Sequence, residues 1–198
     1  MTLKNHFFIY IFILLLAGCD NNNDPQKEDV PEMITKVTLK FTGGGQVVTV
    51  TATDPDGDGV QNIQTDGSLK LLKNTQYTMT IELINGLADP GDEAYDVTAE
   101  VRAESDEHMF YFAWTNNAFS TPAGNGNIDN RADPLDYQDL DANNLPLGLD
   151  TRWKTTDVAT PAATLRVMLK HQPALKSATS SSSDGETDLD LTFDLVIE

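Results

Sequence analysis

The fold is decided by the stretch His108-Met109-Phe110-Tyr111-Phe112-Ala113-Trp114. Aromatic residues favour strands, and after the histidine both the odd and the even positions are apolar or aromatic. Because successive side chains of a strand point to opposite faces, such a strand needs cover on each face. We therefore predict that this stretch is the central strand of the core.

Outward from this stretch, apolar and polar residues alternate with period two, the pattern of a strand with one buried face. The clearest example closes the chain, where Leu189, Leu191 and Phe193 alternate with charged or polar residues. The other predicted strands cover residues 37–41, 48–52, 69–72, 77–83, 135–140, 147–155 and 165–171. We therefore predict β-strands along most of the chain.

Turn residues separate the predicted strands at short intervals. Gly43-Gly44-Gly45 predicts a hairpin turn, Asn85-Gly86 ends a strand, and Asp141-Ala142-Asn143-Asn144 joins a second hairpin. The segment 92–107 combines strand-like alternation with good helix formers, and we predict a short helix there. Together these features predict an all-β protein: an antiparallel β-sandwich of Ig-like architecture, with about eight or nine strands and at most one short helix.

Two connections are longer than a turn. The segment 115–133 is rich in Asn, Gly, Pro and Asp, and we predict a long ordered loop, a type that is uncommon unless it serves a function. The segment 177–185 is rich in serine and predicts a flexible loop.

The first residues have a different character from the rest of the chain. Lys4 precedes an apolar run from Phe7 to Leu16, the pattern of a secretory signal. At about 1.5 Å per helical residue the run spans roughly half of a ~30 Å hydrocarbon core, too little for a membrane-spanning helix. Leu16-Ala17-Gly18-Cys19 resembles the lipobox of bacterial lipoproteins, which implies cleavage before Cys19 and lipidation of that residue. The alternative is an ordinary secretory signal.

The chain then divides into a signal peptide (1–18), a lipidated cysteine with a flexible acidic tether (19–32) and a β-sandwich domain (33–198). From Asp20 to Asp29 the tether has no apolar residue and is too polar to pack. Acidic residues after the cysteine resemble the surface-export signal of Bacteroidota-type lipoproteins, whereas in other bacteria an aspartate there implies inner-membrane retention. We expect a protein of the cell envelope, lipid-anchored to the outer membrane on its periplasmic or surface face.

Composition restricts the partners. The chain has 31 acidic and 13 basic residues and a formal net charge of −18, which becomes more negative when Lys4 leaves with the signal peptide. Such a field repels nucleic acid, so we expect no nucleic-acid partner. It suits cation binding, a basic partner surface, or solubility alone. Cys19 is the one cysteine, so the domain has no disulfide.

Four stretches of the domain carry specific motifs: Gly124-Asn125-Gly126-Asn127-Ile128-Asp129-Asn130, Leu145-Pro146-Leu147-Gly148-Leu149, Leu169-Lys170-His171-Gln172-Pro173 and Gly185-Glu186-Thr187-Asp188. By these motifs the chain, from about Met33 onward, resembles a group of uncharacterised Bacteroidota lipoproteins that often carry the label "type 1 periplasmic binding fold superfamily protein". A fold of that name needs alternating strands and helices around a parallel sheet, which the residue pattern does not supply. The resemblance implies an envelope lipoprotein that passes a ligand to an outer-membrane transporter, and it brings no catalytic residues.

Asp54, Asp56 and Asp58 stand at alternate positions, each followed closely by proline or glycine, which resembles the opening of a calcium-binding loop. The twelfth position of such a loop is Thr65 rather than a bidentate glutamate, so the alternative is a solvated turn between strands. Asp139, Asp141 and Asn143 repeat the spacing more weakly.

His108 and His171 are in phase with apolar faces, one at the start of its predicted strand and the other at the end. If these strands are antiparallel neighbours, both imidazoles meet at one rim of the core, with Glu104 and Glu107 close by in sequence. Two histidines and a carboxylate suit zinc or another transition metal. The alternative is a pair of hydrogen-bonded structural histidines, because no H-x-x-H or H-x-H spacing is present.

Two functions remain open. The first is a lipid-anchored, non-enzymatic envelope protein that binds a small ligand, a metal ion or a partner protein, with calcium ahead of zinc as its cofactor and an outer-membrane transporter as its partner. The second is an envelope hydrolase that acts on glycans or peptides through a carboxylate pair. We favour the first, because the sequence has no G-x-S-x-G motif, no reactive cysteine and no phosphate-binding glycine loop.

Overall fold

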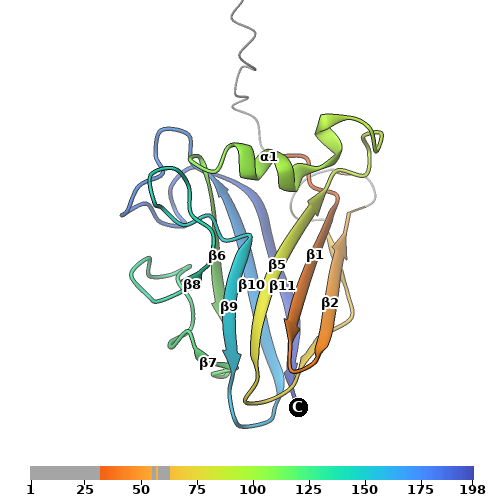
Figure 1. Cartoon of the computed structure of the whole chain (residues 1–198), viewed down its shortest axis with the longest axis vertical. Coiled ribbons are helices and arrows are strands. Elements are labelled where there is room, and N and C mark those ends of the chain that lie inside the picture. Colours follow the sequence, from red (N-terminus) through yellow and green to blue (C-terminus); the bar gives the residue numbers. More distant parts are fainter. Residues whose placement is uncertain (1–31, 55–56, 58–62) are drawn as a thin grey trace, which may run out of the picture.

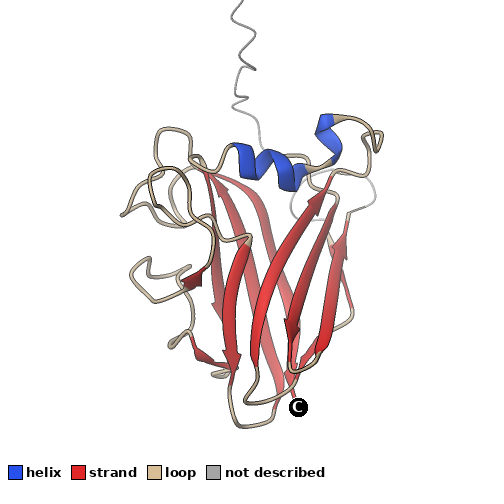
Figure 2. Cartoon of the chain, viewed as in Figure 1, coloured by secondary structure: helices blue, strands red, loops and turns tan. Residues whose placement is uncertain are grey.

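Alternating apolar residues assemble two sheets that face each other, as the computed structural model shows for residues 32–54, 57 and 63–198 (Figures 1 and 2). The first sheet has the order β3 (Gln64–Asp66), β2 (Gln46–Thr53), β1 (Lys36–Gly43), β5 (Gln76–Ile84), β9 (Asp150–Thr155) and β7 (Phe119–Thr121), with β8 (Asp136–Tyr137) also paired to β9. It curls like half a barrel around the second sheet. The all-β sandwich prediction is confirmed.

The second sheet has the order β4 (Leu69–Leu71), β11 (Glu186–Ile197), β10 (Thr160–His171) and β6 (His108–Trp114). Its long strands are antiparallel, but β4 runs parallel to β11, with Leu69 opposite Leu195. The predicted antiparallel pairing holds for the other described strand pairs and not for β4. The described residues form eleven strands. Of these, the short strands β3 and β7 were not predicted from the sequence.

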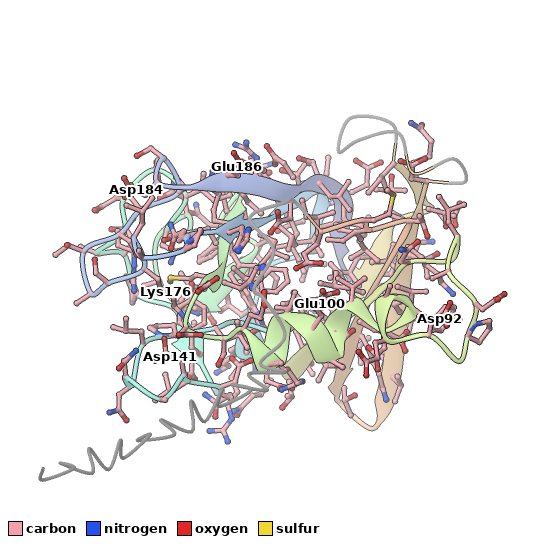
Figure 3. All side chains as sticks on the ribbon, turned by 90° about the horizontal axis from the view of Figure 1, so that it is seen from above. Asp92, Glu100, Asp141, Lys176, Asp184 and Glu186 are labelled. Carbon is pink, nitrogen blue, oxygen red and sulfur yellow. The ribbon has the colours of Figure 1, made fainter. Side chains whose placement is uncertain are left out.

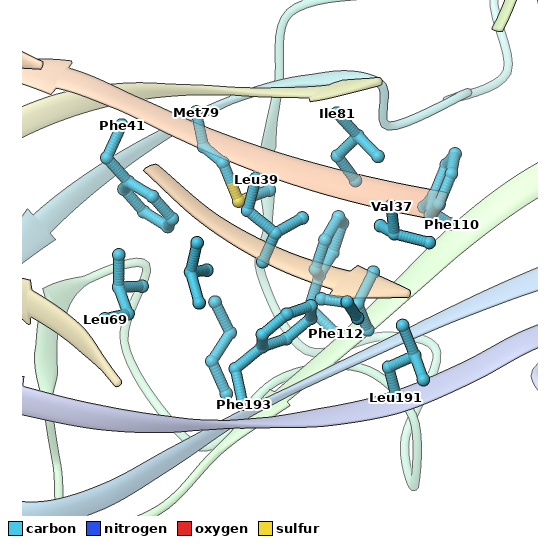
Figure 4. Close-up of a cluster of buried hydrophobic side chains, with 14 of the residues drawn as sticks. Val37, Leu39, Phe41, Leu69, Met79, Ile81, Phe110, Phe112, Leu191 and Phe193 are labelled. Carbon is cyan, nitrogen blue, oxygen red and sulfur yellow. The ribbon is translucent and has the colours of Figure 1, made fainter. Parts of the chain in front are cut away.

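The inner faces of the two sheets interdigitate to form the main core (Figure 4). In the first sheet, Val37, Leu39 and Phe41 of β1 lie fully buried at alternate positions. In the second sheet, Phe112 of β6 and Phe193 of β11 face them and are equally buried. Because each such side chain contributes about 1.5–3 kcal/mol on burial, the alternation seen in the sequence carries most of the fold's stability.

β6 is buried on both faces, as predicted, but it lies at the edge of its sheet and not in the centre. Its outward side chains, Met109 and Tyr111, pack with Met168 of β10 in a second, smaller apolar cluster. Ile128 of the long loop that follows β6 and Tyr137 of β8 cover this cluster. The apolar pattern on both faces therefore reflects a covering loop and not a strand on either side.

The same loop also covers the free edge of β6. The Trp114 N–H donates to the Asn125 carbonyl at 2.9 Å, and the Asn127 N–H donates to the Phe112 carbonyl at 2.8 Å. Gly126 between them has a φ of 100°, and a Cβ there would lie 2.0 Å from the Phe112 carbonyl oxygen. Only glycine permits this approach, so this motif protects a strand edge.

A short helix, α1 (Val97–Ala103), preceded by the 3₁₀ turn η1 (Glu93–Tyr95), lies across the end of the sandwich where β6 begins and β10 ends (Figure 1). The helix prediction is confirmed. The Asp96 carboxylate caps it by accepting from the Ala99 N–H at 3.1 Å, and its buried face consists of Val97 and Val101. No helix among the described residues has the length and apolar character needed to cross a membrane.

The serine-rich loop between β10 and β11 is anchored to the outer face of the second sheet. The Gln172 side-chain amide donates to the carbonyls of Ser181 at 2.9 Å and Asp184 at 3.0 Å. The Tyr111 hydroxyl donates to the carbonyl of Ser180, which is buried. The prediction of a flexible loop missed these anchors, because one comes from Tyr111 on a distant strand and the other from Gln172, just past the end of β10.

Candidate metal centre

His108 and His171 lie directly opposite each other on antiparallel neighbouring strands. They are the next pair after Phe110 and Leu169 in the row of inward side chains that forms the core. Their rings stack with centroids 4.6 Å apart and an angle of 6° between the ring planes. The predicted meeting of the two histidines at one rim of the core is confirmed.

Both rings are buried: 0% of His108 and 2% of His171 is exposed. Nδ1 of His108 lies 3.2 Å from the Glu104 carbonyl oxygen, which can only accept, so this nitrogen carries the proton. In the neutral ring the lone pair is then on Nε2. Among the described residues, Nε2 of either histidine has no hydrogen-bond partner. An imidazole nitrogen buried in this way costs about 1–3 kcal/mol unless a ligand satisfies it.

Glu104 and Glu107 follow the end of α1 and flank the pair, as the sequence suggested. One carboxylate oxygen of Glu104 and one ring nitrogen from each histidine all lie within 4.8 Å of one another. The Glu107 carboxylate lies 3.5 Å from Nε2 of His171, and its backbone carbonyl accepts from the Gln172 N–H. The helix end therefore supplies carboxylates to both rings.

Two further carboxylates face His108, and the sequence prediction included neither. Asp188 Oδ2 lies 3.6 Å from Nε2 of His108, and Glu32 Oε1 lies 3.7 Å from the same nitrogen. The Asp188 side chain is fully buried and that of Glu32 is 10% exposed. Glu32 belongs to the stretch predicted as tether, yet it lies against the core.

Asp188 points inward because of a β-bulge. Along β10 and β11, Leu169 pairs with Leu189 but Lys170 pairs with Thr187, so Asp188 is an extra residue in the ladder. A bulge turns a side chain away from the strict alternation and is frequent next to functional sites. The alternation from Leu189 onward assigned Asp188 to the outer face, and no single-sequence signal marks the register shift.

The electrostatics of the group oppose the charged forms of Glu32, Asp188 and His108. Burial, followed by the charge of Glu100, raises the pKa of Glu32 to about 8, and burial raises the pKa of Asp188 to about 6. Burial, followed by the charge of His171, lowers the pKa of His108 to about 4. A neutral His108 beside carboxyl groups that resist ionisation is what a buried site lacking a counter-charge produces. A divalent cation supplies such a charge, and the donor set suits one.

The calcium prediction rests on three aspartates of which the structure describes one. Asp54 is buried and its Oδ1 accepts from the Gly57 N–H at 3.2 Å, while Asp56 and Asp58 lie outside the described residues. This contact is the local hydrogen bond of an ordinary turn. The calcium site therefore stays a prediction.

The weaker repeat of that spacing, Asp139, Asp141 and Asn143, has a structural role. Asp139 accepts from the backbone N–H groups of Gly148, Leu149 and Asp150 at 2.8 to 3.2 Å. Burial raises the pKa of the Asp139 carboxyl, and these bonds oppose the rise. Because its oxygens accept from these backbone donors, they hold the chain that leads into β9.

Asp141 forms a buried ion pair with Lys176, in which Nζ and Oδ2 are 3.1 Å apart (Figure 3). Its Oδ1 accepts from the N–H groups of Asn143 and Leu145. Burial raises the pKa of Asp141, but these hydrogen bonds and Lys176 outweigh it and the net pKa is lowered. The lysine, and not a metal ion, compensates this carboxylate.

The motif that includes Gly185 also lies at the histidine site. Gly185 has a φ of 73°, and a Cβ there would lie 2.1 Å from the His171 carbonyl oxygen. Glycine therefore lets the chain pass the end of β10 closely enough for β11 to begin beside His171.

No known protein family, curated protein or solved structure matches the chain.

Proposed function

We propose that this chain is a lipid-anchored envelope protein that binds a divalent transition-metal ion between His108, His171 and Glu104. The observation that carries the proposal is the stacked pair of buried imidazoles with no hydrogen-bond partner at either Nε2 among the described residues. Two buried nitrogens beside a carboxylate are the donors that zinc and related first-row ions take. The function is binding, without catalysis.

The ring geometry indicates how an ion is accommodated. Parallel rings 4.6 Å apart direct their lone pairs side by side, so both nitrogens reach one ion only after the rings tilt toward it. Metal–nitrogen bonds of about 2.0–2.1 Å bring the two nitrogens closer than the present spread of up to 4.8 Å among the three donor atoms. We therefore expect binding with a small local rearrangement at the ends of β6 and β10.

The lipobox resemblance supports an envelope location, and the motif resemblance supports transfer of the bound ion to an outer-membrane transporter. The strongly acidic composition favours a cation over an anionic ligand. These parts of the proposal rest on the sequence.

Calorimetric titration of the full chain tests the metal proposal. The protein is purified in detergent without a histidine tag, stripped with a chelator, and titrated with Zn²⁺ and separately with Ca²⁺. We expect saturable one-to-one binding of Zn²⁺ and none of Ca²⁺ at this site, because calcium takes oxygen ligands.

Matched variants assign the site. His108→Phe and His171→Phe keep a stacked aromatic pair and remove the nitrogens, so each is expected to abolish Zn²⁺ binding while the protein stays folded. Since the third histidine of the chain, His6, lies in the signal segment, no other histidine of the domain substitutes. Unchanged Zn²⁺ affinity in both folded variants would overturn the proposal.

The hydrolase alternative needs two carboxyl groups about 5 to 9.5 Å apart in one pocket. Three surface pockets of the described chain have volumes of about 530, 530 and 120 Å³, and the carboxylates that line them are Asp190, Asp133 and Asp136, one in each. These pockets give the hydrolase no support, and we keep the binding function.

A further inference from the structure

The contacts of His108 extend the donor set beyond the three groups of the proposed site. Its Nε2 is fully buried, carries the lone pair, and faces Asp188 Oδ2 at 3.6 Å and Glu32 Oε1 at 3.7 Å. These separations are too long for hydrogen bonds, which need about 2.7–3.2 Å. Two ligands of a tetrahedral zinc ion lie roughly 3.3 Å apart, given bond lengths of 2.0–2.1 Å. The spacing is that of neighbouring metal ligands.

The three groups come from parts of the chain with no local relation. Glu32 precedes β1, His108 opens β6, and Asp188 is the extra residue of the bulge in β11. The bulge costs ladder pairing and places a carboxylate in a buried position beside other carboxyl groups. Burying such a group is expensive unless an opposite charge accompanies it. A cation at this point removes that cost.

From this geometry we infer that Glu32 and Asp188 are ligands of the metal ion bound at His108, and that the bound ion ties the segment preceding β1 to β11. The inference rests on the proposed function and adds the residues that complete the site. With Glu104 and His171, it gives two nitrogen and up to three carboxylate donors. Such a mixed set suits Zn²⁺, Mn²⁺ or Fe²⁺ and disfavours Cu⁺, which prefers sulfur.

The tie has a consequence for the anchor. Glu32 stands thirteen residues after Cys19 in the sequence. If the ion holds Glu32, it fixes the point at which the described domain begins. Metal occupancy then limits how the domain can turn relative to the membrane.

Isosteric variants of the full chain test the ligands. In Glu32→Gln and Asp188→Asn the shapes are kept and the charges removed, and each is expected to weaken Zn²⁺ affinity at least about tenfold, as the loss of a metal-site carboxylate typically does. Asp194→Asn is the matched control, since it removes an exposed charge from the same strand. We expect its affinity to change less than about threefold.

Hydrogen exchange gives a second readout. Zn²⁺ should slow exchange of the amides of residues 33–36 in the wild-type protein, and this local protection should be lost in Glu32→Gln while the rest of the domain stays protected. If Glu32→Gln and Asp188→Asn both bind like wild type while the histidine variants do not, this inference is overturned and the proposed function stands. If wild type binds no Zn²⁺, the proposed function fails first.

Discussion

At the scale of single residues, Glu32 governs the pH dependence of the metal-free protein. Its pKa is raised from 4.5 to about 8, so between these values the folded protein keeps a proton that the unfolded chain releases. Stability contributed in this way falls as pH rises. Asp188, raised from 3.8 to about 6, acts in the same direction over a lower range. The pKa of His108 is lowered from 6.5 to about 4, so His108 acts in the opposite direction. Between these values the unfolded chain binds a proton that the folded protein does not, and stability rises with pH.

Above pH 6.5 Glu32 is the main titrating group of these three, because the pKa of Asp188 in the folded protein and that of His108 in the unfolded chain do not exceed 6.5. We therefore expect the metal-free protein to lose roughly 1 kcal/mol of unfolding free energy between pH 6.5 and pH 8, and Glu32→Gln to remove this loss. Urea unfolding at both pH values, with a chelator present, measures it. The same pH slope in wild type and variant would refute the assignment of the raised pKa to Glu32.

Of the five residues in the proposed site, the sequence predicted His108, His171 and Glu104 and missed two. The phase of His108 and His171 with their apolar neighbours predicted that both rings are buried. The antiparallel pairing of their strands then predicted that the two rings meet. It missed Asp188, because a bulge changes the face of a residue without a local signature. It missed Glu32, because a polar residue beside a polar stretch gives no sign that it packs against a distant strand.

At the scale of elements, the buried ion pair joins two connections that have no ladder between them. Lys176 follows β10 and donates to the Ser105 carbonyl at 2.6 Å as well as pairing with Asp141. Burial lowers the pKa of Lys176, and the charge and hydrogen bond of Asp141 oppose this. The pair therefore holds the loop before β9 against the segments that follow α1 and β10.

Removing one partner of this pair should cost more than removing both. Lys176→Met leaves a buried carboxylate without its cation, and we expect a loss of about 3–5 kcal/mol in unfolding free energy. The double variant Asp141→Asn with Lys176→Met should recover at least half of the loss, since Asn can still accept from the Asn143 and Leu145 N–H groups. Lys73→Met, at an exposed position, is the control and should change stability by less than about 0.5 kcal/mol. Chemical denaturation compares them, and equal losses in the single and double variants would contradict the pairing energy.

The elements themselves were predicted better than their order. Period-two alternation gave most of the length of the long strands, since one buried face dictates that pattern, but it missed residues 160–164 of β10. The place of β6 at a sheet edge was not predictable, because a loop and a neighbouring strand cover apolar side chains equally well. The strand β4 was predicted, but its parallel direction was not, because three residues carry no information about direction.

At the scale of the whole molecule, the prediction concerns the attachment to the membrane. The apolar run from Phe7 to Leu16 spans only about half of a hydrocarbon core, so the stable anchor is expected to be the lipid on Cys19. Cys19→Ala removes the single thiol of the chain and with it the predicted site of lipidation. We expect most of the variant to move from the detergent phase to the aqueous phase on partitioning, while its thermal unfolding stays that of wild type. A variant that still fractionates wholly with membranes would show that the attachment lies elsewhere, and the proposed link between the ion at Glu32 and the anchor would then lose its basis.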